Sequence, residues 1–331
     1  MLNWAILGTG FISHQVADAV AMSMSSNIFA IAGRNIDALD EMQDKYSPEK
    51  IYSGYESVFA DPEVDIIYIG LPNHIHHTMT QRAAENGKAV LCEKSLCTNM
   101  ADASALIECV RKHNVFFVEG LMYLSHPVIR KFVSLLQDGR FGTLKSINGY
   151  YAADIAKFAN PLGKGTLYNL GCYPVSLMHL TIQTMCGEKA FLNRELSGTG
   201  NWSAIDGNLQ DASTAVRFNN GVLATLQSSD SYGLAHRFDV IGENGTLSFI
   251  TNPWLPLAGR NHIRWEGYDG STEDIYVDAD HDAFYHQVKM VEASLSQKSK
   301  EAIRPAPRLK DSLEIMAFLT EWEAACLKAN Q

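Results

Sequence analysis

The chain of 331 residues lacks the apolar segments and cysteine pairs that would place it in a membrane or in an oxidising compartment. No apolar run approaches the roughly 18 to 20 residues needed to cross a bilayer. The N-terminus shows neither the charged leading segment nor the cleavage pattern of a signal peptide. The six cysteines are scattered without a CxxC pair, which is typical of reduced thiols in a core. We therefore expect a cytoplasmic protein.

Positive charge is also scarce, because 27 Lys and Arg residues face 37 Asp and Glu residues, for a net charge of −10. This balance argues against a nucleic-acid partner and against binding to an anionic membrane surface. A local cationic pocket for a small anionic ligand remains compatible with it. With 46% hydrophobic residues, the length predicts two domains that each bury a core of their own.

Strand and helix patterns alternate over the first 120 residues. Short apolar segments there are typical of strands buried on both faces of a parallel sheet. They are Asn3–Leu7, Ile28–Ala32, Val64–Gly70, Ala89–Cys92 and Val115–Glu119. Because helical patterns separate them, we expect an α/β domain over residues 1–122, with a doubly wound parallel sheet of the Rossmann type.

Beyond residue 122 the pattern changes to strands joined by tight turns. Asn-Gly pairs at Asn220-Gly221 and Asn244-Gly245 favour two β-hairpins, because both residue types tolerate positive φ. Helical patterns return at Pro174–Met185, Asp282–Ser296 and Leu309–Lys328. We therefore expect residues 123–331 to form an α+β domain with a large, mainly antiparallel, open-faced sheet for substrate binding and oligomerisation.

A glycine-rich turn directly follows the first predicted strand and opens the first predicted helix. Gly8 allows the tight turn, Gly10 lets the backbone approach a pyrophosphate, and Ser13 is small enough for close helix–strand packing. This strand–turn–helix context predicts a dinucleotide site, whereas the alternative is a glycine turn without a ligand. The expected binding residues are Gly8, Thr9, Gly10, Phe11 and Ile12.

The end of the second predicted strand indicates which dinucleotide is preferred. An acidic residue there would bind the ribose 2′-hydroxyl of NAD, but this chain has Gly33-Arg34-Asn35. Arg34 can hold a 2′-phosphate and stack on adenine. We therefore expect NADP as the cofactor, with NAD as the alternative. A solvated surface arginine is the other interpretation of Arg34.

Several motifs in the same order resemble the Gfo/Idh/MocA oxidoreductase family, most closely its dimeric dihydrodiol dehydrogenase and glucose–fructose oxidoreductase-like subgroup. The resemblance extends over the whole chain. Its motifs are Gly8–Ser13, Leu71-Pro72-Asn73 with His76, Glu93-Lys94, Glu119–Tyr123 with His126-Pro127, and Ile241–Thr246. It implies that Leu71, Pro72, Asn73, His76, Glu93 and Lys94 contribute to cofactor binding.

The same resemblance implies two catalytic residues, Lys94 and Tyr173. Lys94 matches the lysine of the family's Glu-Lys-Pro motif, although Ser95 stands in place of the proline. Tyr173 falls where relatives place a histidine or a tyrosine, and Asn169 replaces the acid that usually precedes it. A solvated lysine and an ordinary packed tyrosine are the alternatives.

The chemistry of these two side chains fits hydride transfer. A free phenol has a pKa of about 10, and a nearby ammonium group would favour its phenolate. Tyr173 could then exchange a proton with a substrate oxygen, while Lys94 stabilises negative charge on that oxygen. Asn169, Asp154 and Lys157 are further candidates for substrate contacts, although solvated loop charges explain the last two equally well. His74, His76 and His77 lack a cysteine or carboxylate at metal-ligand spacing, so we expect no metal.

Together these observations predict an NAD(P)-dependent oxidoreductase acting on a hydroxyl or carbonyl carbon of a sugar, polyol or trans-dihydrodiol. We expect a homodimer or homotetramer formed through the C-terminal sheet. Two other functions stay open: a non-catalytic regulator that senses the dinucleotide, and an NAD-dependent glycosidase of the same family.

Overall fold

The computed structural model describes residues 1–329, which divide into two compact units. The first unit comprises Met1–Ser125 and Phe284–Leu313, and the second comprises His126–Ala283 together with the chain from Glu314 onward. The sequence analysis drew a single boundary at residue 122 and gave no signal for the return of residues 284–313 to the first unit.

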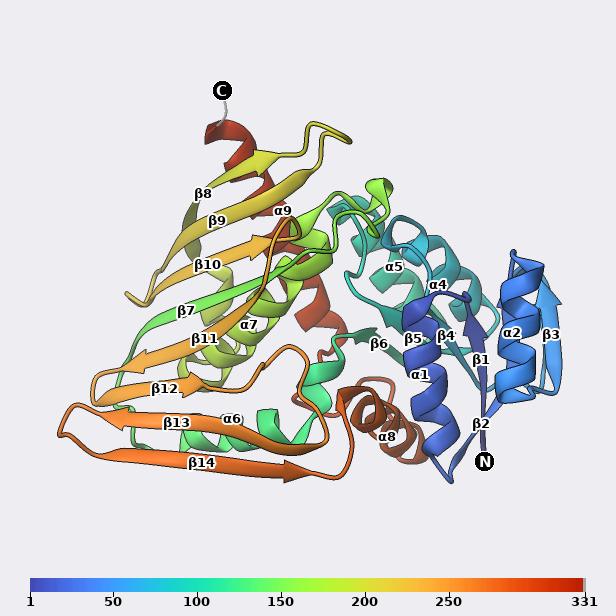
Figure 1. The fold of residues 1–331 in the computed structure, drawn as a ribbon, viewed down its shortest axis with the longest axis horizontal. Coiled ribbons are helices and arrows are strands. Elements are labelled where there is room, and N and C mark those ends of the chain that lie inside the picture. The colour runs from blue at the N-terminus through green and yellow to red at the C-terminus, as the bar shows by residue number, and fades with distance from the viewer. Residues whose placement is uncertain (330–331) are drawn as a thin grey trace. The chain divides into compact units, whose positions relative to one another are not determined.

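The first unit is built on a parallel sheet with the strand order β3-β2-β1-β4-β5-β6 (Figure 1). Its strands are β1 (Leu2–Leu7), β2 (Ser26–Gly33), β3 (Lys50–Ser53), β4 (Ile66–Ile69), β5 (Ala89–Glu93) and β6 (Phe117–Gly120). The strand order reverses between β1 and β4, so the crevice at the carboxyl ends of these two strands is where such sheets bind ligands. The predicted doubly wound α/β domain is confirmed.

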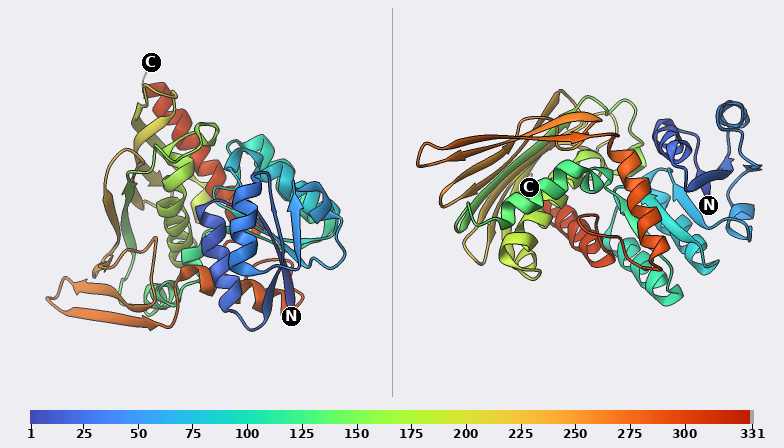
Figure 2. Two further views of the ribbon diagram at one scale, coloured as in Figure 1. Left: turned by 45° about the vertical axis from the view of Figure 1, so that its right-hand side comes forward. Right: turned by 90° about the horizontal axis from the view of Figure 1, so that it is seen from below.

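Helices cover both faces of this sheet, with α1 and α2 on one side and α4 and α5 on the other (Figure 2). The helices of the N-terminal segment are α1 (Phe11–Met22), α2 (Ile36–Tyr46), α3 (Glu56–Phe59), α4 (His76–Glu85) and α5 (Met100–His113). Except for β3, the strands consist mainly of buried apolar residues, as expected for strands covered on both faces.

Helix α8 (Ala283–Ser296) completes the core of the first unit from a distant part of the sequence. Val288 and Val291 join a buried cluster with Trp4 and Val16. Ser26 Oγ donates a hydrogen bond of 2.6 Å to Glu292 Oε1. The apolar face of α8 therefore stabilises the same core as β1 and α1.

The second unit contains an eight-stranded sheet in the order β14-β13-β12-β11-β7-β10-β9-β8. The strands are β7 (Leu144–Ala153), β8 (Arg194–Trp202), β9 (Leu209–Phe218), β10 (Leu223–Ser229), β11 (Leu234–Gly242), β12 (Gly245–Phe249), β13 (Gly259–Gly267) and β14 (Thr272–Ala279). All neighbouring pairs are antiparallel except β7 and β10, which run parallel. The mainly antiparallel sheet and both Asn-Gly hairpins are thus confirmed.

Helices α6 (Pro127–Gln137), α7 (Cys172–Cys186) and α9 (Leu309–Ala329) supply the helical layer of this unit (Figure 1). Strands β9 and β10 alternate between buried and exposed residues, so one face packs on a core and the other meets solvent. Every residue of α7 from Cys172 to Gln183 is buried, which places this helix in the centre of the unit. None of the helices in residues 1–329 combines the length and apolarity needed to span a bilayer.

Candidate active site

Two glycines meet where the strand order of the first sheet reverses. Gly8 follows β1 with φ of +103°, and a Cβ placed on it would lie 2.6 Å from the carbonyl oxygen of Gly70. A Cβ on Gly70, directly after β4, would lie 2.4 Å from Ser13 Oγ. The glycine turn, β4 and the start of α1 therefore pack closely only because these positions lack side chains, as the sequence predicted for Gly8.

The N-terminus of α1 fits a pyrophosphate. Gly10 is its N-cap residue, and within residues 1–329 no side chain caps it and no acidic residue lies in its first turn. A Cβ on Gly10 would meet no atom within 4 Å, so the space in front of the helix is open. Phe11 is 79% exposed beside it. Backbone N–H groups and the helix dipole together favour a bound anion here.

Arg34 follows β2 and is exposed, whereas the next residue caps a helix. Asn35 Oδ1 accepts a hydrogen bond of 3.2 Å from the Ala38 N–H at the start of α2. The first carboxylate after β2 is Asp37, which lies in the first turn of α2. Among residues 1–329, Arg34 forms no ion pair, so its guanidinium group is available for an anionic ligand.

The loop after β4 is tied to the loop after β5 by a buried histidine. Leu71, Pro72 and Asn73 lead from β4 into α4, whose first residue is His76. The two ring nitrogens of His76 lie 2.7 Å from the Leu71 carbonyl oxygen and 2.9 Å from that of Ser95. Burial lowers the pKa of His76 to about 4, so the neutral ring donates one hydrogen bond at neutral pH. The His76 ring thus lies between the two loops and, in its neutral form, donates to only one of these two carbonyl oxygens.

The segment that carries Lys94 is held by Glu93 at the end of β5. Tyr68 donates a hydrogen bond of 3.0 Å to Glu93 Oε1, and Glu93 Oε2 accepts from the Lys94 N–H at 3.3 Å. Burial raises the pKa of Glu93, and the charge of Lys94 opposes that rise. The Lys94–Ser95 peptide bond is cis.

A second buried carboxylate, which the sequence analysis did not single out, supports the same loop. Glu119 lies at the end of β6, where it pairs in register with Cys92 of β5. Its Oε1 accepts a hydrogen bond of 2.8 Å from the Leu96 N–H. Burial raises the pKa of Glu119 to about 7. The sequence did contain a signal for this site. Glu119 is an acidic residue near the end of the apolar strand β6, and the neighbouring strand β5 ends in another acidic residue, Glu93.

In the second unit, Tyr173 belongs to a cluster of buried aromatic rings. It lies near the start of α7 and is 5% exposed. Its ring stands perpendicular to that of Tyr151, with centroids 5.3 Å apart, and lies 6.3 Å from the ring of Trp254. These contacts fix the orientation of the phenol ring.

Asn169 lies four residues before Tyr173, on the short η4 helix (Leu167–Gly171) that continues directly into α7. Asn169 Nδ2 donates a hydrogen bond of 2.9 Å to Asp230 Oδ2, just after β10. The sequence analysis missed Asp230. It could have been noticed as an acidic residue that directly follows a strand of alternating buried and exposed residues. A carboxylate therefore lies beside Asn169, where the resemblance had led us to expect an acid in the motif itself.

Asp154 and Lys157 lie just after β7, and both side chains are exposed. They form an ion pair with a separation of 3.8 Å between Lys157 Nζ and Asp154 Oδ2. As substrate contacts, both residues stay predictions.

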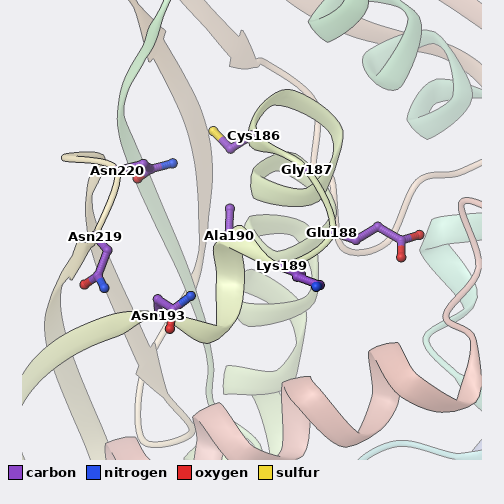
Figure 3. A pocket seen from close by; sticks show the side chains of 8 residues that line it. All are labelled: Cys186, Gly187, Glu188, Lys189, Ala190, Asn193, Asn219 and Asn220. Atoms are coloured by element: carbon purple, nitrogen blue, oxygen red, sulfur yellow. The ribbon is translucent and has the colours of Figure 1, made fainter.

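A hollow with a volume of about 590 Å³ contains none of the predicted site residues (Figure 3). It lies beyond the end of α7, where Cys186 and Gly187 face the Asn219-Asn220 turn. Tyr173 lies thirteen positions before Cys186, the last residue of α7, which corresponds to about 20 Å along the helix. The hollow is therefore separate from the candidate site.

Comparison with protein families explains the two units. The family described as "Oxidoreductase family, NAD-binding Rossmann fold" matches residues 2–121, and the C-terminal domain of the Gfo/Idh/MocA proteins matches residues 129–248. Together these matches cover well over half of the chain. The predicted enzyme class and a nicotinamide dinucleotide as cofactor are thereby confirmed.

Individual relatives carry out related redox reactions. The chain is 27% identical over 262 residues to a trans-1,2-dihydrobenzene-1,2-diol dehydrogenase of Xenopus tropicalis, covering 77% of each protein. It is 28% identical over 189 residues to a D-xylose 1-dehydrogenase (NADP(+)) of Haloferax volcanii, covering 55% of this chain and 58% of that protein.

The fold has counterparts among solved structures. A 3-ketoreductase from Actinomadura kijaniata in complex with NADP superposes with a TM-score of 0.83 at 20% identity, over 98% of this chain and 97% of that one. This structural match supports the fold, whereas the assignment to a protein family rests on the two family matches. The chain belongs to the Gfo/Idh/MocA family of oxidoreductases.

Proposed function

We propose that the protein transfers a hydride between NADP and a hydroxyl or carbonyl carbon of a sugar, polyol or trans-dihydrodiol. The observation that carries this proposal is the position of Lys94. It follows β5 at the carboxyl edge of the Rossmann sheet, and its loop is held by Glu93, His76 and Glu119. Ligands of such sheets bind at this edge.

Tyr173 and Lys94 have separate roles in the proposed reaction. The bound nicotinamide supplies or accepts the hydride. During reduction Tyr173 Oη gives a proton to the carbonyl oxygen, and during oxidation it removes the proton from the hydroxyl. Lys94 Nζ binds the same oxygen and stabilises its negative charge. The aromatic contacts with Tyr151 and Trp254 keep the phenol ring of Tyr173 in one orientation.

NADP is the proposed cofactor because Arg34 offers an exposed guanidinium group directly after β2. The xylose dehydrogenase from Haloferax volcanii, which uses NADP, supports this preference. The family motif predicts that the loop from Leu71 to Asn73 contacts the nicotinamide half. The hydrogen bonds of His76 would hold that loop in place.

The substrate class is proposed from the relatives and from the polar groups near Tyr173. The dihydrodiol and xylose dehydrogenases both act on carbons that carry a hydroxyl group. Asn169 is placed one helical turn from Tyr173, so it is the best supported substrate contact of the second unit. Asp154 and Lys157 are weaker candidates because they already pair with each other in solvent.

We also propose a homo-oligomer formed through the exposed face of the second sheet. Most of the exposed residues that β9 and β10 place on this face are uncharged, namely Ser213, Ala215, Leu223, Thr225 and Gln227, whereas Arg217 is an exposed charge. Light scattering of the purified protein would give the assembly size. A monomer at micromolar concentration would contradict this proposal.

The Tyr173→Phe variant tests the catalytic proposal. General acid–base catalysis typically contributes a factor of about 10² to 10⁴. We expect NADP⁺ reduction with a panel of sugars, inositols and trans-dihydrodiols to fall by that factor, with NADP⁺ affinity unchanged. Tyr151→Phe is the matched control, because it removes a neighbouring buried hydroxyl and should change turnover less than tenfold. Turnover that survives Tyr173→Phe would remove this residue from the mechanism.

A further inference from the structure

A small polar cavity of about 20 Å³ lies in the second unit beside the end of β10. Its polar lining residues are Asn160, Asn169, Ser203, Asp206, Asn208, Gln210 and Asp230. Lysine, arginine and histidine are absent from the lining within residues 1–329. A hollow of this size accommodates one water-sized group, such as a single hydroxyl.

Asp230 lines this cavity and has one carboxylate oxygen without a hydrogen-bond partner in residues 1–329. The residue is 3% exposed, and its Oδ2 is occupied by the hydrogen bond from Asn169. Its Oδ1 is buried and has no hydrogen-bond partner in residues 1–329. Buried carboxylate oxygens without a partner are costly and call for an explanation. A ligand that donates a hydrogen bond provides one.

The backbone holds Asp230 in place independently of its side chain. Its N–H donates to the Gln210 carbonyl oxygen at 3.0 Å, and its own carbonyl accepts from Ile155 and Ala156 at 3.0 and 2.9 Å. The carboxylate is therefore fixed before any ligand arrives, which is the arrangement expected of a recognition group.

The charge of the surroundings selects the kind of ligand. Burial and the nearby carboxylates of Asp206 and Asp211 raise the pKa of Asp230. Asp206 accepts hydrogen bonds from Asn208 at both oxygens, at 3.1 and 2.9 Å, so it offers little to a metal ion. A carboxylate or phosphate group would be repelled here. A neutral hydroxyl group can donate a hydrogen bond to Asp230 Oδ1, and it needs neither a positive surrounding nor further free carboxylate oxygens.

Asn169 links this cavity to the proposed catalytic residue. Asn169 and Tyr173 are four residues apart on the continuous helix formed by η4 and α7, so their side chains leave the same side about one turn apart. We propose that Asp230, oriented by Asn169, is a specificity-determining residue that accepts a hydrogen bond from a second hydroxyl of a neutral, polyhydroxylated substrate. This inference rests on the proposed function, because the role of Tyr173 makes this turn of the helix part of a substrate site.

A binding experiment tests the inference without requiring turnover. NMR titration of the full-length protein, in the presence of NADPH, would give dissociation constants for xylitol, for pentane-1,5-diol and for xylonate. We expect xylitol to bind about 10-fold or more tightly than either of the others, as a hydrogen bond to a charged group typically provides. Asp230→Asn, which keeps the shape of the side chain, should abolish this preference. Asp211→Asn is the matched control and should keep it, because Asp211 is held by Ser229 and Ser231 and does not line the cavity.

Failure of this inference can be told from failure of the proposed function. A preference for xylitol that Asp230→Asn retains, equal binding of all three compounds, or no binding at all would overturn the role of Asp230. Tyr173→Phe should keep the preference while losing turnover. A preference that depends on Asp230 in a protein without turnover on any substrate would support the inference and contradict the proposed function. Loss of affinity for all three compounds alike in Asp230→Asn would indicate a structural role and would also overturn the inference.

Discussion

The buried carboxyl group of Glu119 should make the stability of the protein fall as the pH rises through neutrality. Burial raises its pKa to about 7 from an ordinary value of 4.5. Between these two values the folded chain holds a proton that the unfolded chain has lost. The free energy of unfolding therefore decreases as pH rises, and the whole contribution is lost above pH 7.

The size of this effect follows from the gap between the two pKa values. Because each tenfold change in proton affinity corresponds to 1.36 kcal/mol, the gap amounts to roughly 3 kcal/mol. Side-chain exposure does not reduce the figure, since Glu119 is 1% exposed. Nearby Glu93 contributes to the raised pKa, whereas the hydrogen bond from the Leu96 N–H opposes it.

The Glu119→Gln variant isolates this contribution, because an amide keeps an acceptor for the Leu96 N–H but does not titrate. Urea unfolding at pH 5, 6, 7 and 8 and constant ionic strength would give the stability of both proteins. We expect the wild-type protein to lose about 2 to 3 kcal/mol relative to the variant between pH 5 and pH 8, because part of the full contribution is already lost at pH 5. Glu41→Gln, on an exposed position of α2, should leave the pH profile unchanged. Parallel profiles for wild type and Glu119→Gln would refute the reasoning.

Two further substitutions test the dinucleotide site. Arg34→Ala should weaken NADPH binding by about 10- to 100-fold, as loss of a charge-assisted contact would, and should affect NADH much less. Fluorescence titration would measure both affinities, and equal losses would contradict the assignment of the 2′-phosphate to Arg34. Gly8→Ala should destabilise the fold by about 1 to 3 kcal/mol, because φ of +103° and the Gly70 carbonyl oxygen at 2.6 Å both oppose a Cβ. Thermal unfolding would detect this loss, and an unchanged midpoint would show that the turn relaxes freely.

The sequence predicted the strands and turns whose local residue pattern matches their place in the fold, such as apolar segments that form buried strands. The buried strands β1, β2, β4, β5 and β6 are mainly apolar, and the two hairpins carry Asn-Gly pairs at their turns. Strand β3 was missed because its four residues, Lys50–Ser53, are only partly buried and show no apolar run. The parallel pairing of β7 with β10 was missed for another reason, since it joins segments about 77 residues apart without a local signal.

The residues of the candidate site also fall into those that could be predicted from the sequence and those that could not. Gly8, Gly10 and Lys94 lie in short motifs whose chemistry can be recognised from neighbouring residues. Asp230 meets Asn169 across 61 positions of sequence, and only the pairing of β9, β10 and the segment at Ile155 brings them together. Glu119 depends on the register of β6 against β5. Such contacts follow from the strand order and register, and the spacing of residues along the sequence does not reveal them.

The return of α8 to the first unit determines the order in which the protein can fold during synthesis. Strands β1 to β6 leave the ribosome first, yet the cluster around Trp4 and Val16 is incomplete without Val288 and Val291. Ala302 and Ala306 of the same cluster, and Glu301, which pairs beside Phe117 of β6, emerge later still. The entire eight-stranded sheet is translated before these residues. The first domain to begin therefore cannot complete its core until the eight-stranded sheet of the second unit has been translated, and a fragment cut at residue 122 would leave apolar surface exposed to water.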